Sequence, residues 1–385
     1  MKEFKLDDTD MDEISQTIKN KGIEGFNYTN EQIAIIGNAI EKQKQRANIE
    51  NTETSGNDED FSAINLIRRD KEKWLKNTDE ILGLKLNKFP KLTKAIDGIQ
   101  AGLVIIGADA NVGKTGLLIS FAVDLMRSNE NTFVLFFSGD DSDSQILTRL
   151  IANAGKTTTI NTIKKLGYYK KINDEKTVNN IENAIRDTEA LLGNNIMIFD
   201  RSSMTSFKDI ENKIKKHKKD GRNIVVCIDA LLNFDIDIEI NDQRLQYERR
   251  ATLIKAIATL NEVPIITTAE LRKLTTKGKE SSKQTMHDIA ETRKYSFESD
   301  AIFILNNKQI NELEETKKNN DTVEINLSLA KNKFSNMKGD VPLEANVKRS
   351  QIYEIDSNKP RKILPVNIPR STNVYGTSNI QDYRF

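Results

Sequence analysis

One short stretch constrains this chain more than any other, Gly107-Ala108-Asp109-Ala110-Asn111-Val112-Gly113-Lys114-Thr115. It follows the apolar run 103–106 and precedes the helix-like segment 116–122, so the order is strand, loop, helix. Backbone N–H groups of such a loop, at the positive end of the helix dipole, can surround a polyphosphate. The sequence therefore predicts a phosphate-binding loop.

Two side chains of this loop have a specific expected role. Lys114 would reach the β- and γ-phosphates of a nucleoside triphosphate, and the Thr115 hydroxyl would hold Mg²⁺. Ala108 stands where the usual pattern has glycine, with Gly107 just before it. The expected cofactors are ATP and Mg²⁺, and the residues expected to bind them are Ala108, Asp109, Ala110, Asn111, Val112, Gly113, Lys114, Thr115 and Gly116.

From Leu86 onward, apolar strand-like runs alternate with helical patterns. Helical patterns separate most of the first five runs, which favours an α/β fold with a mostly parallel twisted sheet and helices on both faces. The strands are expected at 103–107, 132–138, 195–200, 223–229, 263–268, 300–306 and 323–330.

The strand expected at 223–229 ends in a carboxylate, Asp229. Phosphate-loop enzymes use an acid in this place to help hold Mg²⁺. A buried strand followed by an Asp is common, so the prediction depends on the presence of Lys114 and Thr115 in the same chain. We therefore expect Asp229 and Thr115 to share the metal.

The composition narrows the class of protein. A chain of 385 residues is long enough for one large domain with appendages, and its net charge of +1 favours neither a polyanion-coated nor a membrane-bound protein. The single Cys227 lies in an apolar run and is expected to be a buried thiol, which excludes an internal disulfide. With no apolar run of membrane-spanning length, the protein is expected in the cytoplasm, without a membrane partner.

The rest of the chain is divided by changes in pattern. The segment 61–77 places apolar residues at near-helical spacing among charges, which predicts an amphipathic helix that docks either on its own domain or on a neighbouring subunit. The expected organisation is a small helical segment at 1–47, a flexible linker at 48–60, the amphipathic linker helix at 61–77, an ATPase domain at 86–358 and a tail at 359–385.

Several segments, in this order, resemble the DnaB-like replicative helicases of bacteria and phages. They are the phosphate loop, Phe136-Phe137-Ser138-Gly139-Asp140, Val226-Cys227-Ile228-Asp229, Asn261-Glu262-Val263-Pro264 with the strand that follows to Arg272, and Lys331-Asn332-Lys333 before Gly339. The resemblance covers about residues 61–356. It implies a RecA-like motor, phage-like, that forms a hexameric ring, hydrolyses ATP between subunits and translocates on single-stranded DNA. A helicase loader or other replication proteins are its further implied partners.

The resemblance also assigns catalytic residues, with three departures from the family pattern. Asp140 stands in place of the catalytic Glu, Glu270 in place of the Gln that senses the γ-phosphate, and Lys333 in place of the Arg finger from the adjacent subunit. Lys331 matches the paired lysine of the family, and Lys114 completes the set. For Asp140 to Asp143 the residues alone leave another interpretation open, a solvated turn or a helix cap.

A basic loop follows the strand that ends near Glu270, at 272–283. RecA-like rings place a loop in their central channel at this point, where a belt of positive charge tracks a phosphate backbone without reading its sequence. The alternative is a solvated surface loop. The residues expected to bind DNA are Arg272, Lys273, Lys277, Lys279 and Lys283.

Two other functions stay open beside the helicase. One is a DNA-binding or scaffold ring whose nucleotide site is regulatory, and the other is a recombinase-like filament. The first 47 residues look too short for the helical N-terminal domain with which such helicases engage primase, so that partnership is not expected.

Overall fold

The computed structural model describes residues 62–155, 158–203, 206–219, 221–231, 234, 242–271, 285–289, 293–306 and 322–355. The chain forms two units, Met1–Glu80 and Ile81–Phe385, which are described separately. The predicted helical segment at 1–47, the linker at 48–60 and the tail at 359–385 lie outside the described residues.

The described part of the first unit is a single helix, α3, at Ala63–Lys76, within the range where an amphipathic helix is predicted. Its N-terminus is capped by the Ser62 side chain, which accepts a hydrogen bond from the Asn65 backbone N–H at 3.4 Å. None of its residues is buried within the chain. The large apolar side chains that it exposes are Ile64, Ile67, Trp74 and Leu75.

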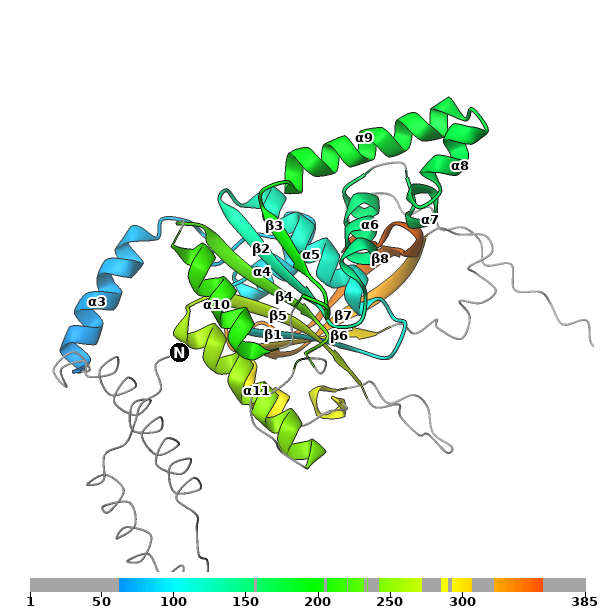
Figure 1. Cartoon of the computed structure of the whole chain (residues 1–385). Helices are drawn as coiled ribbons and strands as arrows, with labels where there is room; N and C mark the ends of the chain where they lie inside the picture. Colours follow the sequence, from blue (N-terminus) through cyan, green and yellow to red (C-terminus); the bar gives the residue numbers. More distant parts are fainter. Residues whose placement is uncertain are drawn as a thin grey trace, which may run out of the picture. The chain divides into compact units, whose positions relative to one another are not determined.

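The second unit is built on a nine-stranded sheet with the order β3-β2-β4-β5-β1-β6-β7-β8-β9 (Figure 1). Neighbours from β3 to β6 pair in parallel, and β6 to β9 pair antiparallel. The strands are β1 (Gly102–Ala108), β2 (Thr132–Ser138), β3 (Ile196–Phe199), β4 (Asn223–Asp229), β5 (Pro264–Glu270), β6 (Ala301–Asn306), β7 (Thr322–Asn332), β8 (Asp340–Asn346) and β9 (Gln351–Glu354).

All seven predicted strands are confirmed, and two further strands, β8 and β9, were not predicted. In β8 the apolar residues alternate with polar ones, but Pro342 interrupts the pattern and argues against a strand. The register shows how the proline is tolerated, because β9 pairs with β8 only from Leu343 onward. A four-residue strand such as β9 is too short to give a periodic signal.

Helices cover both faces of the sheet, as predicted (Figure 1). Among the described helices, none combines the length and apolar character needed to cross a bilayer. The helices are α4 (Pro90–Ile96), α5 (Lys114–Ser128), α6 (Asp143–Ala154), α7 (Ile160–Ile163), α8 (Leu166–Lys171), α9 (Glu175–Leu192), α10 (Phe207–Lys218), α11 (Gln243–Leu260) and α12 (Lys294–Glu298).

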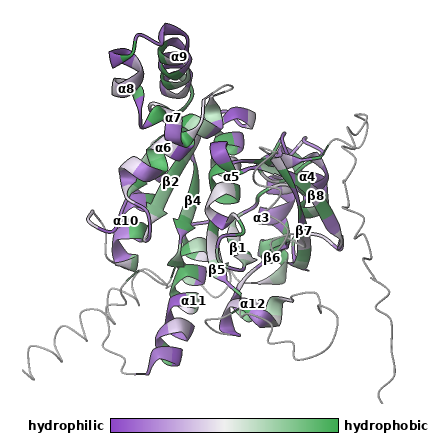
Figure 2. Cartoon of the chain, turned by 90° about the vertical axis from the view of Figure 1, so that its right-hand side faces the viewer, coloured by the Kyte–Doolittle hydropathy of each residue, from purple (hydrophilic) through white to green (hydrophobic). Residues whose placement is uncertain are grey.

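The alternation of side chains along β1 divides the core into two layers. Val104 and Ile106 pack with residues of α5, whereas Leu103 and Ile105 pack on the other face with residues of α10 and α11. Figure 2 shows the apolar colour concentrated on the strands and the hydrophilic colour on much of α10 and α11. Both faces of the central strands are therefore buried, as in other parallel sheets.

The parallel strands bring their carboxyl ends to one edge of the sheet. Ala108 at the end of β1 lies opposite Glu270 at the end of β5, and Ser138 at the end of β2 lies opposite Asp229 at the end of β4. The connections that follow these strands meet at this edge, which is where open α/β sheets bind ligands.

At the start of the second unit, the backbone of Gly83-Leu84 packs closely against that of Gly98-Ile99. This contact generates a prediction. Leu84 and Ile99 exchange two backbone hydrogen bonds of 2.9 Å, and a Cβ atom at Gly83 would lie only 2.6 Å from the carbonyl carbon of Gly98. We expect Gly83→Ala to lower the stability by about 2 kcal/mol or more, because backbone has to move. Thermal unfolding measures this change.

Gly167→Ala is the matched control. An added methyl group at Gly167 in α8 meets no atom within 4 Å, so alanine should be neutral or stabilise the helix by up to about 1 kcal/mol. Equal melting temperatures for the two variants would show that the contact at Gly83 does not constrain the fold.

Candidate functional site

The phosphate-loop sequence forms the connection between β1 and α5. Ala108 and Val112 are buried in the core, whereas Ala110 and Asn111 are exposed. Asn111 (φ 62°) and Gly113 (φ 115°) have left-handed backbone conformations, of the kind that turn successive N–H groups toward a common centre. The loop is thus anchored at two points and presents its backbone between them.

The start of α5 is suited to an anion. Gly113 is its N-cap residue and has no side chain with which to cap the helix, so the first amides keep no side-chain acceptor at that position. The dipole of the 15-residue helix adds positive potential at the same point. These features fit the phosphates of a nucleotide.

Lys114 lies over the loop that it follows. Its Nζ donates hydrogen bonds to the carbonyl oxygens of Ala108 at 3.1 Å and Asp109 at 3.0 Å. The ammonium group is therefore held within the curve of the loop, where the sequence places the charge that contacts phosphate.

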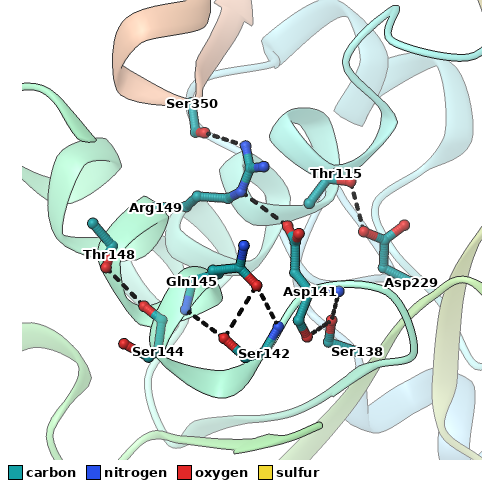
Figure 3. A network of polar contacts seen from close by, with 10 residues as sticks. All are labelled: Thr115, Ser138, Asp141, Ser142, Ser144, Gln145, Thr148, Arg149, Asp229 and Ser350. Atoms are coloured by element: carbon teal, nitrogen blue, oxygen red, sulfur yellow. Dashed lines mark hydrogen bonds and ion pairs between the residues drawn. The ribbon is translucent and has the colours of Figure 1, made fainter. Parts of the chain in front are cut away.

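Asp229 and Thr115 lie side by side (Figure 3). The Thr115 hydroxyl donates to one carboxylate oxygen of Asp229 at 2.6 Å, and the Thr268 hydroxyl donates to the other at 2.6 Å. Asp229 is only 4% exposed. A hydroxyl and a carboxylate are the oxygen ligands that Mg²⁺ prefers, so this pair fits the predicted metal site.

Burial controls the charge of Asp229. It raises the pKa of Asp229 above the ordinary value, the hydrogen bonds from Thr115 and Thr268 oppose this rise, and the charges of Asp140 and Asp141 add to it. The two hydroxyl donors stabilise the ionised form of the carboxylate in a site whose burial disfavours negative charge.

The turn after β2 is fixed beside Asp229 by the Ser138 hydroxyl and by one backbone hydrogen bond. The Ser138 hydroxyl donates to the Asp141 carbonyl at 2.6 Å and accepts from the Asp141 N–H at 3.1 Å, while the Gly139 N–H donates to the Asp229 carbonyl at 2.6 Å. Asp140, within this turn, is exposed and acts electrostatically on Asp229. The turn therefore brings Asp140 near Asp229 and the predicted metal site.

The sequence allowed an aspartate of this turn to be the N-cap of the following helix, but the N-cap of α6 is another residue. Ser142 is the N-cap of α6, and it forms a capping box with Gln145. Asp140 therefore does not cap the helix, and it lies in an exposed turn, as the alternative interpretation of 140–143 allowed.

The turn after β2 carries Asp140 and Asp141 and is called the acid turn below. Arg149 of α6 joins this turn to the C-terminal part of the sheet (Figure 3). Its Nε donates to the Asp141 carboxylate at 3.1 Å, and its Nη1 reaches the Ser350 hydroxyl at 3.5 Å. The Ser350 carbonyl in turn accepts hydrogen bonds from Asn153 and Ser120. Asp141 therefore takes part in an ion pair that fixes the turn against α6.

Glu270 lies next to the first residue of the phosphate loop. It is the exposed last residue of β5, in register with Ala108, and the N–H of the following Leu271 donates to the Ala108 carbonyl at 3.1 Å. Lys114, Thr115, Asp140, Asp229 and Glu270 are thus gathered at one edge of the sheet.

Lys331 and Lys333 lie at the opposite edge. The end of β7 is paired with the start of β6, and the Lys333 N–H donates to the carbonyl of Asp300, whose own N–H donates to Leu103 at the start of β1. The six residue steps along β1 from Gly102 to Ala108 span about 20 Å. The two lysines are therefore far from the phosphate loop of their own chain.

The two lysines differ in how they are held. The Lys331 Nζ donates to the carbonyl oxygens of Ser296 at 2.5 Å and Phe297 at 3.2 Å. Partial burial, and then the charge of Lys333, lower the pKa of Lys331 to about 8. The Lys333 side chain is 52% exposed.

The five residues predicted to contact DNA, Arg272, Lys273, Lys277, Lys279 and Lys283, lie outside the described residues. The described chain stops at Leu271 on one side of the basic loop and resumes at Thr285 on the other.

Comparison with known proteins identifies the family. Residues 83–352 match the family described as "DnaB-like helicase C terminal domain". The chain belongs to this family. The family match spans every described residue of the site, from the phosphate loop to Lys333.

Individual relatives support the same assignment. The chain is 26% identical over 252 residues to the replicative DNA helicase DnaB of Mycoplasma genitalium, covering 64% of this chain and 51% of that protein, so it spans about half the length of this relative. Its fold is similar to that of a solved ATPase domain (TM-score 0.64, 18% identity, 77% of this chain and 99% of that one). It is also similar to a DnaB-like replicative helicase described with its interactions with primase (TM-score 0.63, 18% identity, 90% and 75%). The RecA-like fold is thereby confirmed.

Some residues of the site were not found from the sequence. Thr268, Ser138 and Arg149 are brought to Asp229 and its acid turn by strand register and by α6. The pair Thr267-Thr268 within an apolar strand was the one available signal, because buried hydroxyl groups need partners. The ion pair of Arg149 with Asp141 joins the turn after β2 to the second turn of α6. No sequence motif indicated this pair.

The raised pKa of Asp229 generates a prediction about stability. A carboxyl group whose folded pKa lies above the unfolded value of 3.8 stabilises the fold at low pH, and this contribution is lost as the pH rises through the folded pKa. At neutral pH the ionised group therefore costs stability. We expect Asp229→Asn to raise the free energy of unfolding of the nucleotide-free protein by on the order of 1 kcal/mol. This change is measured as a higher melting temperature.

The same substitution should remove the effect of Mg²⁺. Wild-type protein is expected to gain stability when ATP and Mg²⁺ are added together, whereas Asp229→Asn should gain no more from the pair than from ATP without metal. A lower melting temperature for nucleotide-free Asp229→Asn than for wild type would contradict the assignment of burial as the main cause.

Proposed function

We propose that this protein is an ATP-dependent replicative DNA helicase that works as a hexameric ring on single-stranded DNA. The observation that carries this proposal is the pairing of Thr115 with Asp229 beside the phosphate loop, in a chain of the DnaB-like family. The name of the Mycoplasma genitalium relative supports it, although the chain spans about half of that protein. We place its activity in the cytoplasm.

The proposed nucleotide site assigns each residue one task. Lys114 and the backbone of 108–116 bind the phosphates of ATP, and Thr115 and Asp229 hold Mg²⁺, which supplies positive charge against the phosphate oxygens when bound. Asp140 accepts the proton of the attacking water, and Glu270 lies close enough to the loop to respond to its occupancy. The shorter side chain of Asp140 favours slow hydrolysis.

The position of Lys331 and Lys333 supports an active site shared between subunits. Because they lie about 20 Å of strand away from their own phosphate loop, they can complete a neighbour's site but not their own. Lys333 offers a point charge where a guanidinium would grip two oxygens. This arrangement requires a ring or a filament.

Single-stranded DNA is the proposed substrate of the basic loop. Arg272, Lys273, Lys277, Lys279 and Lys283 would contact its phosphate backbone. A helicase loader or other replication proteins are further proposed partners. The interactions with primase described for the related helicase are not carried over to this chain.

A regulatory nucleotide site in a DNA-binding ring is the second candidate. Asp140 and Lys333, each a weaker version of the family residue, favour it. A filament of RecA-like subunits is the third, and negative-stain images separate ring from filament.

The first test is the dependence of ATPase activity on DNA. We expect single-stranded DNA to increase the turnover of the wild-type protein, because translocation couples the channel loop to hydrolysis. Lys114→Ala should abolish turnover because the phosphates lose their lysine, and Thr115→Ala should mimic removal of Mg²⁺. Wild-type turnover in Lys114→Ala would contradict the site, and turnover indifferent to DNA would favour the regulatory ring.

The second test asks whether Lys333 acts on a neighbouring subunit. Lys333→Ala should lower kcat more than it raises KM, because the ammonium stabilises charge that develops on the γ-phosphate. Lys333→Arg should raise kcat, since a guanidinium can bind two phosphate oxygens.

Mixed rings sharpen this second test. Rings formed from Lys333→Ala and Lys114→Ala subunits should regain part of the activity, because some boundaries then combine an intact loop with an intact lysine. Absence of recovery in rings shown to be mixed would remove Lys333 from the neighbouring site.

A further inference from the structure

Asp300 lies at the centre of the lysines at the far edge of the sheet. One carboxylate oxygen, Oδ2, accepts a hydrogen bond from the Lys255 ammonium of α11 at 2.5 Å and another from the Leu103 N–H at 2.8 Å. The Asp300 carbonyl accepts from the Lys333 N–H at 2.8 Å. Both the side chain and the main chain of Asp300 therefore join the start of β1 to the segment that carries Lys333.

The backbone of β1 makes room for this carboxylate. Gly102 has a φ of 142°, a conformation that favours glycine, and a Cβ atom there would lie 2.4 Å from Asp300 Oδ2. The Asp300 side chain is 14% exposed. The carboxylate is thus set into the edge of the sheet and held from two sides.

The two oxygens of Asp300 are used unequally. Oδ2 receives two short hydrogen bonds, whereas Oδ1 faces the Lys333 ammonium at 3.8 Å, which is too long for a hydrogen bond. Lys255 is 25% exposed and Lys333 is 52% exposed. Asp300 therefore forms a hydrogen-bonded ion pair with Lys255 and attracts Lys333 through charge alone. The Lys333 side chain is left able to move.

Lys331 adds a third ammonium group to the cluster. It is held by the carbonyl oxygens at the end of α12, and the charges of Lys333 and Lys255 lower its pKa while that of Asp300 raises it. The other charged groups on α12 are Lys294 and Glu298, which pair with each other at 3.2 Å. Asp300 therefore pairs with Lys255 and Lys333 and acts on Lys331 through its charge.

We propose that Asp300 is the positioning residue for the lysines that act on a neighbouring subunit, with Lys255 as its fixed partner and Lys333 as its releasable one. This inference rests on the proposed function, because it gives the lysine pair a task at the subunit boundary. Occupation of Asp300 by Lys255 keeps Lys333 near the boundary without trapping it. Lys333 can then move to the γ-phosphate of the neighbour.

Two substitutions should act in opposite directions on Lys331. Asp300→Asn removes the attractive charge and should displace the Lys331 titration to lower pH, whereas Lys255→Met removes a repulsive charge and should displace it to higher pH, each by roughly 0.5 to 1 pH unit. The measurement is NMR of the full chain with ¹³Cε-labelled lysine. The Lys331 resonance is assigned from its loss in Lys331→Arg.

Glu298→Gln is the matched control, since it removes a nearby carboxylate that pairs with Lys294 and should leave the Lys331 titration unchanged. Displacements of the same sign in Asp300→Asn and Lys255→Met, or none in either, would overturn the proposal. A general loss of structure cannot produce opposite signs. If Asp300→Asn does not fold, the contrast of Lys255→Met with Lys255→Arg, which keeps the charge, decides the outcome.

ATPase measurements connect this cluster to turnover. Asp300→Asn and Lys255→Met should each lower kcat about tenfold with KM within about twofold, the first because Lys333 is repelled and the second because Asp300 captures it. Lys255→Arg should restore most of the rate, and wild-type kcat in both variants would overturn the positioning role. Normal turnover in Lys333→Ala would instead remove the neighbouring-site function, and the Lys331 titration would then decide the cluster independently.

Discussion

The hydrogen bonds of Thr115 and Thr268 to the buried Asp229 carboxylate join the three segments on which the site depends. They connect the start of α5 with the ends of β4 and β5. Burial disfavours the negative charge of Asp229, and two hydroxyl donors partly offset this cost. A fold that holds an acid in this way keeps the proposed metal ligand in place at the expense of its own stability, which is a frequent compromise at functional sites.

The acid turn beside Asp229 shows how neighbouring residues divide structural and chemical tasks. Ser138 fixes the turn, Ser142 caps α6, and Arg149 holds Asp141. Asp140, between Gly139 and Asp141 in this turn, is exposed. The same arginine reaches Ser350, whose carbonyl also accepts from Ser120 of α5, so the loop helix, the acid turn and the last strands form one connected network.

The direction of the strands separates the two sets of residues that we propose act in one reaction. Parallel strands place the phosphate loop, Asp229 and Glu270 at one edge, whereas antiparallel β7 carries Lys331 and Lys333 to the other. The proposed site, which uses both sets, would therefore be assembled from two subunits. At the far edge, Asp300 accepts hydrogen bonds from Lys255 and from the Leu103 N–H. Its contact with Lys333 is longer and is an ion pair without a hydrogen bond.

Local signals in the sequence determined much of this protein. Periodic apolar runs gave the first seven strands, and the spacing from Gly107 to Thr115 gave the loop, because these depend on neighbouring residues and on backbone chemistry. Only the tertiary structure decided the partners of Asp229, the ion pair of Arg149 with Asp141 and the cluster around Asp300. The partners of Asp229 and of Asp300 are far apart in the chain, and strand register and helix packing bring them together, which no local pattern encodes. Arg149 lies only eight residues from Asp141, but no sequence motif indicates that their side chains meet.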